Sequence, residues 1–97
     1  MKLEESIKEC GFTRIDGDAG IEITSITSDS RKVNPGAMFI AVKGYAGDGH
    51  RFIASALEKG AAAIMYEDRQ KLEVQVNAYK ANGGNVEKTA FVEVKNS

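Results

Sequence analysis

The fold is decided by the stretch from Met38 to Tyr66, which reads MFIAVKGYAGDGHRFIASALEKGAAAIMY. Its first residues are too continuously apolar for a half-exposed strand and predict a strand covered on both faces. The next apolar side chains fall at helical spacing: Phe52, Ile53, Ala56 and Leu57. Gly60 is placed to end that helix, and the apolar run Ala61–Tyr66 predicts a second buried strand. Strand, loop, helix and strand in this order predict a βαβ unit, whose crossover is right-handed in nearly all proteins.

The residues before this unit predict a short helix, a turn and a further strand. The apolar stripe of a helix ending at Gly11 is formed by Leu3, Ile7 and Cys10. Asp16-Gly17-Asp18 signals a turn. The alternation of apolar and polar residues over Ile21–Ile26 predicts a strand with a local irregularity.

The residues after the unit can be read with two periods. Leu72, Val76 and Tyr79 have helical spacing, whereas residues 74–78 also alternate. The charged lead-in and the stop at residues 82–84 favour a helix over Arg69–Lys80, and Ala90–Val94 predicts a closing strand. We therefore expect an α/β fold, a small central sheet flanked by helices, forming one domain over residues 1–97.

Composition excludes several classes of function. Thirteen Lys and Arg residues stand against fourteen Asp and Glu residues, so the cationic field of a nucleic-acid binder is missing. No apolar stretch approaches the roughly 20 residues that cross a bilayer, and the first residues lack a signal-peptide pattern. Cys10 is the single cysteine and is expected in the core, and no Cys/His cluster predicts a metal site. We expect a cytosolic, metal-free, soluble monomer that binds neither nucleic acid nor membrane.

Ser30 and Arg31 are the sharpest candidates for ligand binding. A hydroxyl and a guanidinium where a strand gives way to a loop suit an anionic or polyhydroxylated ligand. The alternative is a solvated turn in which Asp29 pairs with Arg31 or Lys32 while Ser30 caps local backbone groups. From the residues alone both interpretations stay open, and the turn is the simpler one.

The loop Lys43–His50 is a second candidate. Its glycines let backbone amides approach a ligand, and it leads into a helix N-terminus that Asp48 is placed to cap. Tyr45 offers an aromatic face for a base, but the loop lacks the Gly-Lys-Ser/Thr ending of an ATP-binding phosphate loop. The alternative is a connection whose glycines serve turn geometry. His50 is the only histidine, and beside Asp48 it is expected to cap a helix or orient a loop rather than act as a general base.

The separate motifs form one longer pattern. It runs from Ile26-Thr27-Ser28-Asp29-Ser30-Arg31-Lys32-Val33-x-Pro35-Gly36-x-x-Phe39-x-Ala41-x-x-Gly44 through Asp48-Gly49-His50-x-Phe52-Ile53 to Ala56-x-x-x-Gly60-Ala61. This pattern resembles the amino-terminal domain of the Mur ligases, which add amino acids to the UDP-linked precursor of the bacterial cell wall. It is most similar to the MurE type, which joins the third amino acid to UDP-N-acetylmuramoyl-L-alanyl-D-glutamate. A MurF-type ligase and a stand-alone binding domain of the same fold are the alternatives.

The resemblance implies which residues touch the substrate. Ser30 matches the serine that contacts the UDP-sugar, and Ser28 occupies a nearby backbone contact. The loop residues that border the uracil correspond to Tyr45, Ala46 and Gly47. Other residues often stand in the family at the positions of Ser28 and Tyr45, which favours backbone contacts there. Weaker candidates are Arg31, Asp48 and His50.

The resemblance also implies a three-domain enzyme of peptidoglycan synthesis, and hence a part in cell shape and division. Its first domain holds the UDP end of the substrate, its central domain binds Mg-ATP, and its last domain selects lysine or diaminopimelate. This chain reaches Ser97 without the ATP-binding glycine-lysine loop. We therefore expect the two other domains to lie outside it, as in an excised domain or a truncated gene product, and the fragment to be catalytically inert. The stretch Asp68–Lys88 is longer than the family usually needs.

Overall fold

The computed structural model describes residues 1–8, 11–44 and 47–95. Its main sheet has five strands in the order β1-β7-β6-β3-β2. The strands are β1 (Phe12–Asp16), β2 (Ile26–Thr27), β3 (Met38–Ala41), β6 (Ala63–Tyr66) and β7 (Ala90–Val94). The helices are α1 (Leu3–Ile7), α2 (Ile53–Glu58) and α3 (Arg69–Ala81), with the 3₁₀ turns η1 (Ser30–Lys32) and η2 (Gly49–Phe52). A separate small hairpin pairs β4 (Lys43–Gly44) with β5 (Gly47–Asp48).

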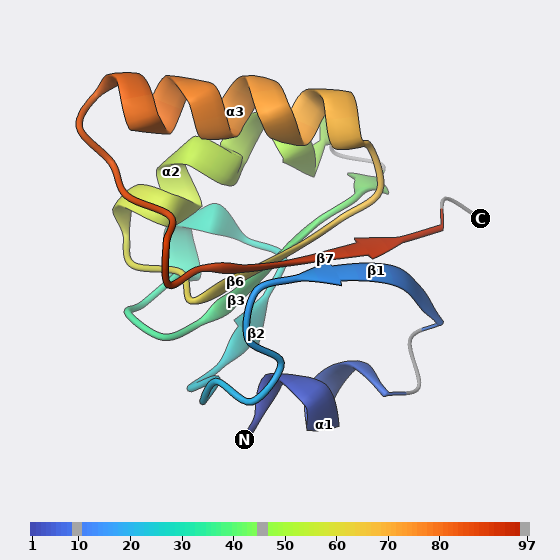
Figure 1. Ribbon diagram of the computed structural model, residues 1–97. Helices are drawn as coiled ribbons and strands as arrows, with labels where there is room; N and C mark the ends of the chain where they lie inside the picture. The colour runs from blue at the N-terminus through green and yellow to red at the C-terminus, as the bar shows by residue number, and fades with distance from the viewer. Residues whose placement is uncertain (9–10, 45–46, 96–97) are drawn as a thin grey trace.

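The predicted βαβ unit is present and sets the direction of the sheet. β3 and β6 pair in parallel, with Met38 opposite Ala63 and Ala41 opposite Tyr66, and α2 connects them. β2 and β7 are parallel to their neighbours as well, whereas β1 is antiparallel to β7 at the edge. Successive parallel strands advance across the sheet in one direction, so right-handed crossovers place their helices on one face. Figure 1 shows α2 and α3 on one side of the sheet and α1 on the other.

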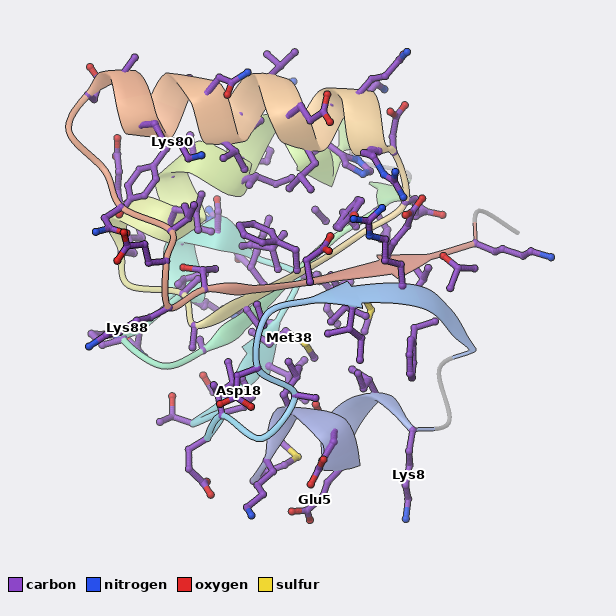
Figure 2. All side chains as sticks on the ribbon, in the orientation of Figure 1. Glu5, Lys8, Asp18, Met38, Lys80 and Lys88 are labelled. Atoms are coloured by element: carbon purple, nitrogen blue, oxygen red, sulfur yellow. The ribbon has the colours of Figure 1, made fainter. Side chains whose placement is uncertain are left out.

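The core has two layers because neighbouring strand residues point to opposite faces. Phe39 and Tyr66 belong to the layer under α2 and α3, whereas Met38 and Met65 belong to the layer over α1. Figure 2 shows Met38 between the sheet and α1. Burying an apolar side chain as completely as Phe39 stabilises the fold by roughly 1.5–3 kcal/mol. Over the described residues, no helix combines the length and the apolar character needed to cross a bilayer.

The helices predicted around residues 52–57 and over Arg69–Lys80 are confirmed as α2 and α3. α2 ends with Gly60 at φ +92°, where the amide of Gly60 donates to Leu57 and that of Ala61 to Ala56, the hydrogen-bond pattern of a glycine-terminated helix. In α3 the helical period holds, since Leu72 is buried while Val74 is 66% exposed. Asp68 caps α3 by accepting a hydrogen bond from the amide of Lys71 at 3.2 Å.

The predictions for the first part of the chain need correction. The strand expected over Ile21–Ile26 is wrong except for Ile26, because the backbone of this segment bonds elsewhere. The amide of Ile23 donates to the carbonyl of Met1 at 2.6 Å, and that of Thr24 to Gly36 at 3.0 Å. Strand β1 was not predicted, since its side chains are mostly exposed and polar. The first helix ends at Ile7 rather than near Gly11, and Cys10 lies outside the described residues.

Candidate functional site

The candidate residues gather at the carboxyl ends of the parallel strands. Residues 28–32 follow β2, the β4–β5 hairpin follows β3, and residues 67–68 follow β6. Figure 1 shows the hairpin and the start of α3 at the same end of the sheet. In open α/β sheets this edge is where ligands bind, because the loops that leave the strands converge there. Two hollows open at this edge.

The first hollow has a volume of about 490 Å³ and joins the predicted serine motif to an aromatic side chain. It is lined by Ser28, Asp29, Ser30, Arg31 and Phe52. Ser28 follows β2 directly, Ser30 and Arg31 lie in η1, and Phe52 comes from η2. Its volume falls within the range of about 300–1,000 Å³ typical of small-molecule sites. The structure therefore brings three of the predicted residues together and adds Phe52.

Arg31 is bound to its neighbour Asp29. The carboxylate Oδ1 of Asp29 accepts from the backbone amide of Arg31 at 2.9 Å and from its Nε at 3.1 Å. Oδ2 accepts from Nη2 at 3.0 Å. The side chain and then the backbone amide of Arg31 lower the pKa of Asp29 to about 2, and Asp29 raises the pKa of Arg31 in return. The Asp29–Arg31 pairing of the turn alternative is thus confirmed and leaves the fork of Arg31 largely occupied, whereas no hydrogen bond from the Ser30 hydroxyl to a backbone group is found among the described residues.

Ser28 and Ser30 keep their hydroxyls available. Among the described residues, neither hydroxyl has a hydrogen-bond partner. The backbone carbonyl of Ser30 instead accepts from Nζ of Lys59 at 2.8 Å, which ties η1 to the end of α2. This contact places a positive charge beside the hollow. The two hydroxyls in the hollow are groups suited to phosphate and sugar oxygens.

The second hollow measures about 250 Å³ and lies around His50 and Asp48. It is lined by Asp48, His50, Arg51, Lys71, Val74 and Gln75. His50 is 1% exposed, and its Nε2 accepts hydrogen bonds from the amides of Glu67 at 3.1 Å and Asp68 at 3.0 Å. An accepting Nε2 carries no proton, so Nδ1 is the nitrogen that donates to Oδ1 of Asp48 at 2.6 Å. Both ring nitrogens are therefore engaged, and His50 orients the loops rather than presenting a free base.

Asp48 caps the 3₁₀ turn η2 rather than α2 as predicted, since the N-cap of α2 is Phe52, which makes no side-chain capping hydrogen bond. Oδ1 of Asp48 accepts from the amide of His50 at 3.0 Å, which caps η2 and so leads the chain into α2. Oδ2 also contacts Nζ of Lys71 on α3. Lys71 first, and then His50, hold the pKa of Asp48 well below its ordinary value, and Asp48 raises the pKa of Lys71.

The hairpin accounts for part of the predicted loop. Gly47 opens β5 and pairs with Gly44, whereas Tyr45 and Ala46 lie outside the described residues. Phe52 was expected on the apolar face of the helix, but it precedes α2 in η2 and is 42% exposed. Phe52 is the first residue of the predicted apolar stripe, where the chain is still a 3₁₀ turn. The sequence pattern therefore predicted neither its exposure nor its place in the hollow. Within the described part of the chain, no three His, Cys, Asp or Glu residues are grouped to hold a metal ion.

Residues 22–96 match a protein-family model described as "Mur ligase family, catalytic domain". The chain belongs to the Mur ligase family. The match takes in both hollows and every residue that lines them.

Curated Mur ligases are similar to this chain over its whole length or most of it. A "UDP-N-acetylmuramoyl-L-alanyl-D-glutamate--2,6-diaminopimelate ligase" of Clostridium tetani is 38% identical over 97 residues, 100% of this chain and 18% of that protein. One with the same name from Chlorobium phaeobacteroides is 47% identical over 70 residues, 70% of this chain and 14% of that protein. A "UDP-N-acetylmuramyl-tripeptide synthetase" of a Roseiflexus species is 55% identical over 68 residues, which are 70% of this chain and 13% of that protein. The chain thus spans less than a fifth of these relatives.

A solved Mur ligase also matches part of the chain. The crystal structure of a MurF ligase from Thermotoga maritima in complex with ADP is 44% identical over the part compared, with a TM-score of 0.45. The match covers 46% of this chain and 10% of the other. At that score it carries no argument about the fold, which rests on the sheet and helices described above.

Proposed function

We propose that this part of a Mur ligase holds the uridine diphosphate end of UDP-N-acetylmuramoyl-L-alanyl-D-glutamate. The observation that carries the proposal is the hollow at the carboxyl edge of the sheet, where Ser28 and Ser30 present hydroxyls without partners among the described residues. Hydroxyls donate to phosphate oxygens and accept from sugar hydroxyls, so one surface serves both halves of a nucleotide-sugar. Ser30 is the central contact, with Ser28 beside it.

The hairpin loop is proposed to close the uracil end of the site. Tyr45, Ala46 and Gly47 are the residues assigned to that border. Gly47 lies only two residues before Gly49, where the turn η2 begins, and η2 supplies Phe52 to the hollow. Asp48 and His50 are then supporting residues, since their side chains hold the hairpin against the loop after β6.

The proposed role is binding rather than chemistry. The family model is described as a catalytic domain, yet both ring nitrogens of His50 are engaged and the carboxylate of Asp29 is bound to Arg31. Mg-ATP does not fit the donor set here, because no acidic cluster is present among the described residues and no Gly-Lys-Ser/Thr loop occurs in the sequence. Binding energy spent on the remote UDP end positions the reacting carboxylate in the other domains of the enzyme. Those domains are proposed to bind Mg-ATP and the incoming amino acid.

We propose the MurE type for the parent enzyme, acting in the bacterial cytoplasm as a monomer. The names of the relatives in Clostridium and Chlorobium support this choice. The full-length ligase is then expected to join lysine or diaminopimelate to the UDP-N-acetylmuramoyl-dipeptide. Absence of that product in a purified, active full-length enzyme would favour the MurF type instead.

The residue test is Ser30→Ala in the full-length enzyme. Losing one polar contact of about 1.5–3 kcal/mol weakens use of the UDP-substrate by roughly tenfold to a hundredfold. We expect the loss mainly in the Michaelis constant for the UDP-substrate, with that for ATP little changed, because the two ligands occupy different domains. Ser25→Ala is the matched control, since Ser25 is exposed and lies outside both hollows. An unchanged Michaelis constant for the UDP-substrate in Ser30→Ala would contradict the assignment.

A further inference from the structure

Phe52 is an aromatic side chain that the core does not use. It is 42% exposed, whereas the next residue, Ile53, is 0% exposed and packs beneath α2 with Ala56 and Leu57. The exposed part of Phe52 faces the same hollow as Ser28 and Ser30. A large apolar ring beside polar groups that lack partners is typical of a site that receives a ligand with a flat apolar face and a polar remainder.

Arg51 makes a cation–π contact with the ring of Phe52. The guanidinium carbon of Arg51 lies 5.0 Å from the centroid of the ring, within the range of a cation–π contact. Arg51 lines the hollow around His50 but not the hollow around Ser30. The guanidinium thus lies over the ring of Phe52 and lines only the neighbouring hollow. Among the described residues, Arg51 forms no ion pair that would draw it off the ring.

The turn that carries Phe52 is fixed at its start. Asp48 caps η2 through the amide of His50, and the buried ring of His50 anchors the turn to the amides of Glu67 and Asp68. A platform whose backbone is already ordered costs less conformational entropy when a ligand binds. Phe52 is thus exposed, its ring is in contact with Arg51, and the backbone of its turn is fixed by hydrogen bonds.

We propose that Phe52 is the surface on which the planar base of a uracil nucleotide stacks, with Arg51 holding the ring through its cation–π contact. The inference rests on the proposed function and assigns to that site a residue on η2 in addition to the hairpin loop. Every nucleobase has a π-face, so stacking supplies affinity while the serines contact the sugar and phosphate oxygens. Removing the aromatic face from either partner is expected to weaken binding by roughly tenfold.

The test compares two probes and three variants of the chain. The probes are uridine diphosphate and its 5,6-dihydro analogue, which keeps the hydrogen-bonding edge of the base but loses the planar aromatic ring. The variants are Phe52→Leu, Phe52→Tyr and the control Phe12→Leu, which alters another exposed phenylalanine, on β1. Affinities come from titrations followed by backbone amide shifts of the ¹⁵N-labelled protein.

We expect the wild-type chain, Phe52→Tyr and Phe12→Leu to bind uridine diphosphate about tenfold more tightly than the dihydro analogue. In Phe52→Leu the two probes bind equally. If both probes shift residues 28–31 but bind the wild-type chain equally, the stacking surface is overturned while the nucleotide site stands. The stacking surface is likewise overturned if Phe52→Leu still binds uridine diphosphate about tenfold more tightly than the dihydro analogue. If neither probe shifts residues 28–31, the proposed function fails together with the inference.

Discussion

The imidazole Nδ1 of His50 lies 2.6 Å from the carboxylate Oδ1 of Asp48, two residues earlier in the chain. The same ring accepts two backbone hydrogen bonds through Nε2, from Glu67 and Asp68. One buried side chain thereby joins the end of the hairpin to the loop between β6 and α3. Since both loops leave carboxyl ends of parallel strands, this contact sets the shape of the edge where the nucleotide is proposed to bind.

Replacing His50 by Ala is expected to lower the free energy of unfolding by about 2–4 kcal/mol, because it removes the acceptor of two partly buried amides and leaves a cavity. Urea denaturation monitored by circular dichroism measures the change. Lys88→Ala, at an exposed lysine, is the control and should stay within about 0.5 kcal/mol of wild type. Long-range ¹H–¹⁵N spectra of the ring should show the proton on Nδ1. A proton on Nε2 would contradict the arrangement.

Replacing Lys71 by Met removes the main group that holds the pKa of Asp48 low. The pair is partly exposed, with Lys71 at 45% and Asp48 at 26%, so we expect a loss of at most about 1 kcal/mol at neutral pH. A depressed folded-state pKa stabilises the protein above the unfolded value, near 3.8, and this contribution fades as the pH falls toward the folded value.

The difference between wild type and Lys71→Met should therefore be constant from pH 7 to about pH 5 and shrink below about pH 4. Urea denaturation across this range and a carboxyl ¹³C titration of Asp48 measure it. Lys80→Met is the matched control, because Lys80 also lies on α3 and is exposed. A difference that grows on acidification would show that Lys71 acts by something other than its charge.

Gly60 and Gly83 provide a matched pair for the cost of a side chain at a helix end. Both follow a helix with positive φ, +92° and +91°, and an L-residue in that region costs roughly 1–2 kcal/mol. A Cβ on Gly83 meets nothing within 4 Å, whereas one on Gly60 lies 3.1 Å from Cα of Pro35. We expect Gly60→Ala to destabilise the fold by about 1 kcal/mol more than Gly83→Ala, measured by thermal and urea unfolding. Equal losses would show that the turn at Pro35 yields to the added methyl group.

Sequence patterns predicted the parts of the fold whose side chains are buried in a regular period. The βαβ unit and α3 are examples: in α3, Leu72 is buried and Val76 and Tyr79 pack against the same core, as a helical period requires, while Val74 is exposed. Strand β1 was not predicted because Ile15 is its only residue that is not exposed, so it shows no alternation of buried and exposed side chains. It is an edge strand, held by its hydrogen bonds to β7 rather than by burial. The segment Ile21–Ile26 has the alternation of a strand, but its amides bond to Met1 and Gly36 instead of a ladder.

The candidate site also has a part that could be predicted from the sequence and a part that could not. Ser28, Ser30 and Arg31 were predicted together because they adjoin in sequence, and they share a hollow. Phe52 lies more than twenty residues further along, and only the packing of η2 against the sheet brings it there. The engagement of Arg31 by Asp29 was one of two open readings, and the choice depended on rotamers that no sequence pattern specifies.

The most direct test of the nucleotide site is a titration of UDP-N-acetylmuramoyl-L-alanyl-D-glutamate into the ¹⁵N-labelled chain. The proposal predicts amide shift changes at residues 28–31 and 44–52, with α1 and β1 unaffected. Uridine diphosphate alone should shift the same residues more weakly, since fewer contacts offset the entropic cost of association. Shift changes confined to residues outside 28–31 and 44–52 would contradict the account, whatever the affinity.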